Sequence, residues 1–208
     1  MGQSSCRGTA GFAMLEALVA MVVLAIGVLG VAGLLLNSSR FSQQASYDTV
    51  AMQLATEMAE RMRANTAVSG VGAAAEALAP NLYFIDTQTS QLPALTRNPY
   101  TTACASTLLS CAQDTARFDV IEWWNRVAAA LPGGRAVICR DTVAYNQTSG
   151  FSWGCTAAAS GRVDDAPIVI KIGWISRLSS KTLGTGADLA DMNARPQIVI
   201  VATPGTVN

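Results

Sequence analysis

Histidine is absent from this chain of 208 residues. Its absence removes the commonest general base of enzymes and a common side-chain ligand of metals. The sequence also lacks a Ser-His or Cys-His pairing and a glycine-rich phosphate loop. Only carboxylate pairs that are distant in the sequence remain open as catalytic groups. We therefore expect no enzymatic activity, no metal site and no cofactor.

Charged side chains are scarce as well, and the two signs balance. Charged residues make up 13% of the chain. The number of Lys and Arg residues, 14, equals the number of Asp and Glu residues, 14. A nucleic acid is attracted by a net basic field, which this composition does not provide. We therefore expect no nucleic-acid partner.

A long apolar run stands near the N-terminus. The 25 residues from Phe12 to Leu36 carry one charge, that of Glu16. At 1.5 Å of rise per residue, this run is long enough for a helix that spans a bilayer of ~30 Å. A lone acid in such a segment is either a functional site with a partner or an acid tolerated near the end of a plain anchor. The apolar run alone leaves both interpretations open.

The stretch before this run differs from a secretory signal. A secretory signal has a basic start and a cleavage site behind its apolar stretch, whereas residues 1–11 hold a single charge, Arg7. The junction at Gly11-Phe12 lies in front of the apolar run. We therefore expect residues 1–11 to be a cleaved polar leader and the helix to remain with the product.

The predicted helix continues beyond the membrane segment. Residues 40–65 contain no Pro or Gly, and apolar residues recur there every three or four positions, at Tyr47, Ala51, Leu54, Met58 and Met62. This spacing is typical of a helix with one buried stripe. We predict one helix over 12–65. Its membrane-spanning half is 12–36, and its amphipathic half, 37–65, packs against a globular domain, 66–208.

Three glycines, Gly27, Gly30 and Gly33, lie in the apolar half of the helix. Small residues let membrane helices approach one another closely, and glycine weakens a helix by about 1 kcal/mol relative to alanine. We expect these glycines to serve helix–helix packing or local unwinding. The alternative is that glycine is simply frequent in membrane helices.

A second helix is predicted in the C-terminal part. Asp114 is a suitable N-cap, and Pro132-Gly133-Gly134 ends the element. Apolar residues between them recur at three or four positions, at Phe118, Ile121, Trp124, Val127 and Leu131. This pattern places Trp124 on the buried stripe and Trp123 at its border. Core and boundary packing explains the two indoles more simply than a ligand site does.

Three strands are expected after this helix, over 136–139, 168–175 and 198–201. The residues that alternate on one face of the second strand are Ile168, Ile170, Ile172 and Trp174. A long N-terminal helix, a small antiparallel sheet and a second helix make an α+β plan.

The five cysteines divide into one and four. Cys6 lies in the leader, and Cys104, Cys111, Cys139 and Cys155 lie in the globular domain. An even number of cysteines in an oxidising compartment favours disulfides, and neither close pair has the ligand spacing of a zinc site. Three connectivities are open. The local one, Cys104–Cys111 with Cys139–Cys155, is favoured because each loop is short.

Two further segments have alternative interpretations. Phe151 and Trp153 lie in the loop that a Cys139–Cys155 disulfide would close, where they either plug the domain or contact a partner subunit. The pair Asp164-Asp165 beside Gly161 has the composition of the start of a calcium loop. Adjacent carboxylates in a turn are more often simply solvated.

The string Gly11-Phe12-Ala13-Met14-Leu15-Glu16, followed by the apolar run, resembles the class III signal of type IV pilins and pseudopilins. The resemblance implies that a prepilin peptidase cuts between Gly11 and Phe12 and that Phe12 is N-methylated. It also implies that Glu16 pairs with the new terminal amine of a neighbouring subunit. The chain would cross the inner membrane once, with a cytoplasmic N-terminus and a periplasmic globular domain, before it enters a pilus filament at the cell surface.

A second resemblance covers the second helix and its surroundings. The motif residues are Cys111, Phe118-Asp119, Trp123-Trp124-Asn125, Leu131-Pro132-Gly133-Gly134, Val137, Cys139, Ile170 and Trp174. Together with the run 24–34, they resemble the PilV family of minor pilins, which are described as type IV pilus modification proteins. The match covers the N-terminal third well and the second helix moderately.

The PilV resemblance implies a structural subunit of low abundance that joins other minor pilins, primes pilus assembly and sits at or near the pilus tip. Its partners would be other minor pilins, the major pilin through the N-terminal helix, and the prepilin peptidase. A tip adhesin is a further candidate partner, although the resemblance implies no adhesin activity. Two other functions stay open: a minor pseudopilin of a type II secretion system, which shares the anchor motif, and a membrane-anchored enzyme or binding module.

Overall fold

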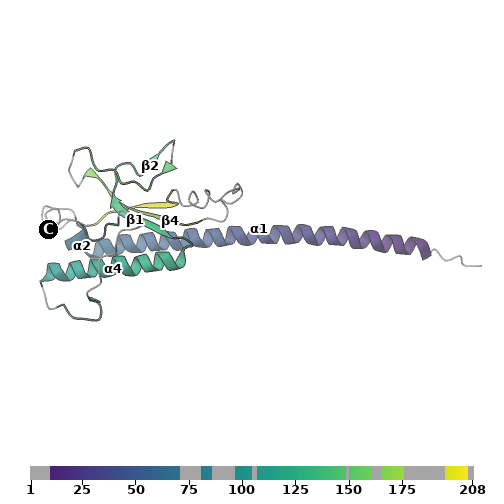
Figure 1. Cartoon of the computed structure of the whole chain (residues 1–208), viewed down its shortest axis with the longest axis horizontal. Helices are drawn as coiled ribbons and strands as arrows, with labels where there is room; N and C mark the ends of the chain where they lie inside the picture. Colours follow the sequence, from purple (N-terminus) through teal and green to yellow (C-terminus); the bar gives the residue numbers. More distant parts are fainter. Residues whose placement is uncertain are drawn as a thin grey trace, which may run out of the picture. The chain divides into compact units, whose positions relative to one another are not determined.

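The computed structural model describes residues 10–70, 81–85, 97–104, 107–148, 150–160, 165–175 and 195–205, with side chains from residue 14 onward. The chain forms two compact units, Met1–Gln43 and Gln44–Asn208. Helix α1 (Ala10–Ala64) contributes residues to both units (Figure 1). The two halves of this one helix therefore have different surroundings.

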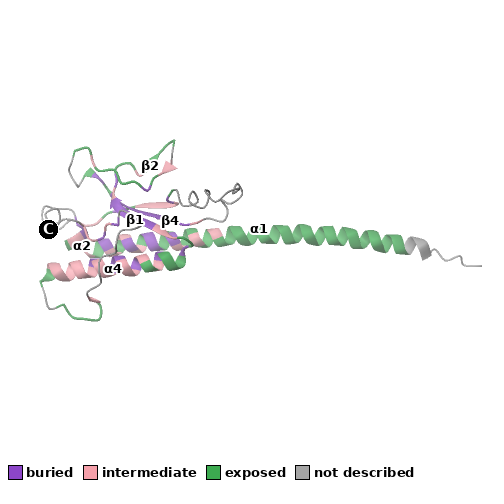
Figure 2. Cartoon of the chain, in the orientation of Figure 1, coloured by how far each residue is buried: buried purple, intermediate pink, exposed green. Residues whose placement is uncertain are grey.

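The N-terminal half of α1 is apolar and open to solvent. Residues 14–43 are exposed throughout (Figure 2), and they include large apolar side chains such as Met21 and Leu24, at 69% and 70% exposure. By length and composition, α1 is able to cross a membrane. The prediction of one helix over 12–65 is confirmed to within two residues at either end, because no Pro or helix-ending signal interrupts it.

In the second unit, a three-stranded antiparallel sheet packs against the C-terminal half of α1 and against helix α4 (Leu108–Ala130). The strands are β1 (Arg135–Arg140), β4 (Ile168–Gly173) and β5 (Ile198–Ala202), in the order β1-β4-β5. A short helix, α2 (Thr66–Ser69), follows α1. This is the α+β arrangement that the sequence predicts.

The predicted strands agree with the observed ones to within two residues at each end. The structure adds a hairpin of β2 (Tyr145–Asn146) and β3 (Gly150–Phe151), and an isolated bridge from Ile85 to Ile138 of β1. Neither was predicted, because strands of one or two residues carry no alternating pattern.

The register of the sheet separates its two faces. Ile170, at the centre of β4, pairs with Ile138 of β1 and with Ile200 of β5. Successive side chains of a strand point to opposite faces. Ile170 therefore faces the helices, and its neighbours Val169 and Lys171 face the other side, which we call the outer face of the sheet.

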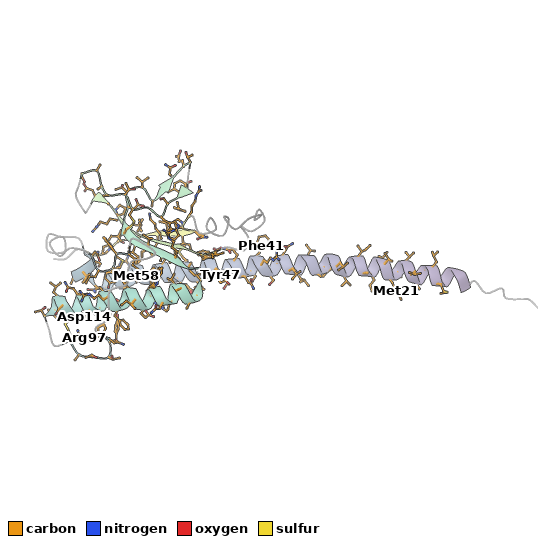
Figure 3. The ribbon with its side chains drawn as sticks, in the orientation of Figure 1. Met21, Phe41, Tyr47, Met58, Arg97 and Asp114 are labelled. Atoms are coloured by element: carbon orange, nitrogen blue, oxygen red, sulfur yellow. A yellow bond between two sulfur atoms is a disulfide. The ribbon has the colours of Figure 1, made fainter. Side chains whose placement is uncertain are left out.

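The main core lies between the sheet and the two helices. The stripe predicted on α1 supplies Ala51, Leu54, Met58 and Met62, each at most 7% exposed. Met58 lies among side chains that crowd this part of the molecule (Figure 3). Because burial of one such side chain is worth about 1.5–3 kcal/mol, the C-terminal half of α1 is an integral part of the globular unit.

Helix α4 begins earlier than predicted. Its N-cap is Thr107, whose hydroxyl oxygen accepts a hydrogen bond from the backbone N–H of Ser110 at 3.4 Å. Asp114 is not the cap; it lies inside the helix and forms ion pairs with Arg97 and Arg117. The first two turns are half-exposed and carry few large apolar residues, so no periodic pattern marks them in the sequence.

The buried face of α4 is turned by one residue from the predicted stripe. Trp123 is fully buried and donates its indole N–H to the carbonyl of Leu54 at 2.8 Å, whereas Trp124 is half-buried. One residue corresponds to about 100° around a helix. The expectation for the two tryptophans was wrong because the true face includes the small Ala116 and the charged Asp119, which do not register as large apolar residues.

The predicted end of α4 is confirmed. The helix ends at Ala130, and Gly133 follows with a φ of +60°. A Cβ on Gly133 would lie 2.6 Å from Cδ1 of Ile175. Glycine is required there by both backbone conformation and space, and this turn leads the chain into β1.

Candidate functional site

The residues that the resemblance to a pilin signal singles out lie in the first unit. Gly11 and Phe12 belong to the first turn of α1, at the edge of the described residues. The side chain of Glu16 is exposed on the same helix. The structure thus brings no described group into contact with this carboxylate, and its predicted pairing concerns a second subunit.

The three glycines of α1 leave a smooth apolar surface. Apart from the adjacent residues and the nearby backbone of α1 itself, no described atom lies within 4 Å of a Cβ placed on Gly27, Gly30 or Gly33. A shallow apolar depression surrounds Gly27, lined by Val23, Leu24, Val28, Val31, Ala32 and Leu35. These positions have the space that a closely packed second helix needs.

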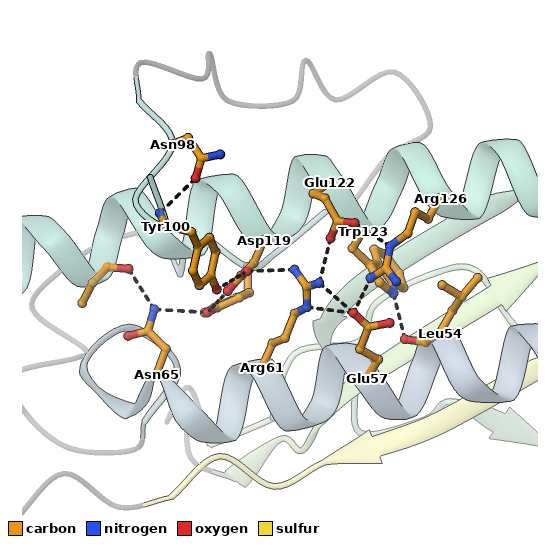
Figure 4. A network of polar contacts seen from close by, with 12 residues as sticks. Leu54, Glu57, Arg61, Asn65, Asn98, Tyr100, Asp119, Glu122, Trp123 and Arg126 are labelled. Atoms are coloured by element: carbon orange, nitrogen blue, oxygen red, sulfur yellow. Dashed lines mark hydrogen bonds and ion pairs between the residues drawn. The ribbon is translucent and has the colours of Figure 1, made fainter. Parts of the chain in front are cut away.

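In the second unit, α1 and α4 are joined by a network of ion pairs (Figure 4). Arg61 of α1 lies at its centre and contacts Glu57 of α1 at 2.7 Å, Asp119 of α4 at 2.8 Å and Glu122 of α4 at 2.7 Å. Burial opposes the charge of Arg61, but the carboxylates around it outweigh burial and raise its pKa.

A second arginine closes the same network. Arg126 of α4 pairs with Glu122 at 2.7 Å and reaches across to Glu57 of α1. The hydrogen bond from Arg126 is the main cause that holds the pKa of Glu57 below its ordinary value, with Arg61 acting in the same direction against burial. Two cations thus sit among three carboxylates, and each arginine bridges the two helices.

The carboxylate of Asp119 is the most buried group of the network, at 2% exposure. Besides the ion pair with Arg61, it accepts hydrogen bonds from the phenols of Tyr83 at 3.2 Å and Tyr100 at 3.0 Å. Burial and the neighbouring Asp119 charge raise the pKa of Tyr83 well above its usual range. Asn65 at the end of α1 donates to the Tyr83 oxygen at 3.1 Å, so the network also fixes the end of the helix.

The loop 97–104 is fastened to α4 by three different contacts. Arg97 pairs with Asp114 at 2.8 Å (Figure 3). Tyr100 packs edge to face on Phe118, with ring centroids 5.4 Å apart. The Cys104–Cys111 disulfide joins the end of this loop to the first turn of α4.

The outer face of the sheet holds a buried ion pair. Lys171 of β4 is fully buried, and its ammonium lies 2.5 Å from Asp141. The same ammonium donates to the carbonyl of Ser152 at 2.8 Å and to that of Gly154. Asp141 accepts two backbone N–H groups as well, from residues 143 and 156. Burial alone would raise the pKa of Asp141, but Lys171 and these N–H groups together lower it.

The Cys139–Cys155 disulfide ties the loop that carries these carbonyls to β1, so the structure has the local connectivity of the four cysteines. Trp153 of this loop is 9% exposed and packs on Val137, Cys139 and Val169 of the outer face. The tryptophan therefore plugs the domain. Phe151 is half-buried and packs edge to face on Tyr145, with centroids 5.3 Å apart.

The calcium alternative for Asp164-Asp165 falls partly outside the described residues. Asp165 accepts a hydrogen bond from the hydroxyl of Ser160, and Asp164 is not described. Over the described ranges, no three His, Cys, Asp or Glu side chains are grouped so that they could hold a metal ion.

Sequence reasoning assigned no ion pair to Arg61, Asp119, Asp141 or Lys171, and it named Asp119 only as a residue of a motif. Asp119 lies off the apolar stripe predicted for its helix, and Lys171 lies on the strand face opposite the alternating isoleucines, so the sequence pattern gives neither residue a signal of burial. The partners themselves, 58 residues away for Asp119 and 30 for Lys171, could not be named without the packing of the helices and the course of the loop after β1.

No protein-family model, no curated protein and no solved structure matches this chain.

Proposed function

We propose that this chain is a minor pilin of the PilV type, a structural subunit that primes the assembly of a type IV pilus with other minor pilins and sits at or near its tip. The observation that carries the proposal is the N-terminal half of α1. Its residues 14–43 are exposed, and Glu16 is the one charge between Phe12 and Leu36. An apolar surface of this length needs a cover, first lipid and later other helices.

The chemistry of Glu16 supports a pairing between subunits. A carboxylate in a low-dielectric surrounding takes up a proton unless a cation faces it. Cleavage between Gly11 and Phe12 would create an ammonium group four residues before Glu16, or roughly 6 Å away along the helix axis. A stagger between neighbouring subunits would bring the ammonium of one to the carboxylate of the next. In this proposal the inner membrane holds the subunit before assembly, and the filament holds it afterwards.

The globular unit has a binding role in this proposal and no enzymatic one. The carboxylates and arginines between α1 and α4 satisfy one another, and two disulfides fasten the loops. Such a unit suits contacts with other minor pilins through the edge of the sheet, the loops and the helix flanks. It needs no cofactor and offers no net basic surface to nucleic acid.

The test is Glu16→Ala in a host that makes type IV pili. Loss of the charge makes the helix more apolar, so the amount of subunit in the membrane fraction should not fall. The amount in sheared pili should fall at least tenfold, because the terminal amine of the neighbour loses its partner. Glu60→Ala is the matched control, since Glu60 lies on the same helix in an exposed pair with Arg63.

If the Glu16→Ala variant and the unsubstituted chain are recovered in equal amounts from sheared pili, the pairing of Glu16 with a terminal amine is contradicted. The result would favour a plain membrane anchor. Absence of the unchanged chain from pili, together with a secretion defect on its deletion, would assign it to the pseudopilins of a type II secretion system instead.

A further inference from the structure

Arg135 at the start of β1 stacks on an aromatic ring of the outer face. Its guanidinium carbon lies 4.2 Å from the centroid of Trp153. Trp153 is itself held against Val137 and Val169, and its loop is fastened by the Cys139–Cys155 disulfide. The plane of the guanidinium is therefore set by a rigid support rather than by a flexible surface.

This cation has no counter-charge in the part of the chain that the structure describes. The side chain of Arg135 makes no hydrogen bond and no ion pair there, and its Nε is shielded from solvent without a partner. By contrast, Arg61, Arg97 and Arg126 each face at least one carboxylate. Burial lowers the pKa of Arg135, with no carboxylate to oppose it. A half-buried charge without a partner is costly in the free subunit and is relieved by an anion that reaches it.

A second cation borders the same loop. Arg195, which precedes β5, is exposed and places its Nη1 3.4 Å from where a Cβ on Gly150 would lie. Gly150 has a φ of +74° and stands three residues before Trp153. Lys171, whose side chain lies on the outer face, is fully buried and occupied by Asp141. Two arginines are thus left to meet an incoming group.

We propose that Arg135, stacked on Trp153, with Arg195 beside Gly150 of the same loop, is a docking site for an acidic segment of a partner protein. A carboxylate would bind the outer edge of the guanidinium through two parallel N–H···O bonds, the geometry that arginine and a carboxylate favour. The proposal goes beyond membership of a filament, because it depends only on the globular unit.

The number of cations favours a protein segment over other anions. A nucleic acid is held by many phosphate contacts along its backbone, and an anionic membrane is recognised by clusters of roughly four to eight basic residues. Among the described residues, two arginines border this loop, on a chain without net charge. One or two acidic side chains on a partner match this site in number and in shape.

The test uses the full-length chain in a non-ionic detergent and two short capped peptides that carry an uncharged fluorophore. One peptide has the sequence Gly-Glu-Glu-Gly and the other Gly-Gln-Gln-Gly, and fluorescence polarisation at low salt measures their binding. We expect the Glu peptide to bind and the Gln peptide to bind at least tenfold more weakly. Arg135→Gln should weaken the Glu peptide at least tenfold, and Arg135→Lys, which keeps the charge but loses the planar fork, should lie between.

Arg117→Gln is the matched control, because Arg117 is a partly exposed arginine of the same unit that already has a partner, Asp114, at 3.5 Å. It should leave the binding unchanged. The near-ultraviolet circular dichroism of the tryptophans checks that the variants are folded. If Arg135→Gln does not fold, the binding of the Glu peptide to Arg135→Lys still tests the site.

Three results would overturn the docking site. The two peptides could bind equally well, Arg135→Gln could bind the Glu peptide as tightly as the unsubstituted chain, or Arg117→Gln could weaken the Glu peptide as much as Arg135→Gln does. Anionic phosphatidylglycerol vesicles or oligothymidylate that bind through Arg135, when the Glu peptide does not, would show that the partner class is wrong. Glu16→Ala should leave the peptide binding unchanged, so a failure of this site is distinguishable from a failure of the pilin proposal.

Discussion

The carboxylate of Asp119 accepts hydrogen bonds from three separate parts of the chain, through Arg61 of α1, Tyr83 and Tyr100. It is nearly inaccessible to water, so none of these donors can exchange its bond for a solvent one without local opening. A single acid thereby fixes the two helices and two connecting segments with respect to one another.

We expect Asp119→Asn to lower the free energy of unfolding by about 3 kcal/mol, since it removes one partner of a largely buried ion pair and presents an amide to three donors. Urea denaturation in detergent, followed by the tryptophan signal, would measure the change. Glu60→Gln, whose ion pair with Arg63 is exposed, should cost less than about 1 kcal/mol. Equal effects of the two substitutions would show that Asp119 has no special role.

At the N-terminus, the residue-scale prediction is cleavage between Gly11 and Phe12. The small Gly11 would let a peptidase approach the backbone, and the polar residues 1–11 would keep the cut outside the bilayer. Mass spectrometry of the protein from its native host should find a methylated Phe12 as the first residue. An intact Met1, or a first residue beyond Leu36, would be incompatible with this processing.

Among the elements, β4 and the loop that follows β1 depend on each other. Lys171 is buried on β4 because the loop brings Asp141 and two carbonyls to its ammonium. The Cys139–Cys155 disulfide, which spans 16 residues of sequence, keeps that loop on the sheet. The disulfide therefore keeps the polar partners of the Lys171 ammonium in place. It also restricts the unfolded chain.

We expect the double substitution Cys139→Ala with Cys155→Ala to lower the free energy of unfolding by about 3 kcal/mol, the value of the chain-entropy model for a loop of ~15 residues. Hydrogen exchange should rise most in the loop over 150–156. A thiol assay of the denatured, unsubstituted protein should find no free thiol after the leader, with Cys6, is removed. Two free thiols in the processed chain would contradict the disulfides.

The elements also show what sequence alone can predict. The helix of 12–65 and the alternating strand at 168 were predictable, because a long apolar run and a period of two are strong local patterns. The start of α4 was not, because its cap Thr107 precedes turns without apolar periodicity. The stripe was assigned to Trp124 instead of Trp123 because the buried face includes the small Ala116 and the charged Asp119. The partner of Lys171 depends on the path of a loop, which no local pattern encodes.

For the whole molecule, the side chains whose pKa values are shifted in the folded state define a pH range of stability. Asp141 and Glu57 have lowered pKa values in the folded state. Their contribution is complete above the unfolded pKa of about 4 and is lost as the pH falls through the lower folded pKa. Tyr83 and Tyr100 have raised pKa values, so their contribution is complete below about pH 10 and is lost at higher pH.

We therefore expect the urea midpoint of the protein in detergent to be nearly constant from about pH 5 to pH 9 and to fall on both sides of this range. Asp141→Asn should reduce the decrease of the urea midpoint at acidic pH, because the carboxyl group whose protonation contributes to that decrease is removed. Tyr83→Phe should reduce the alkaline fall. Unchanged pH profiles in both variants would mean that other groups set the limits.

The globular unit takes part of its core from the end of α1, where Ala51, Met58 and Met62 are fully buried. This decides where the chain tolerates a cut. A protease that acts on the exposed residues 37–43 would release a fragment with every core residue in place. A chain that begins at Thr66 would lose the α1 side chains that cover part of the inner face of the sheet, and we expect it to aggregate. A soluble fragment for crystallisation or immunisation should start before Gln44.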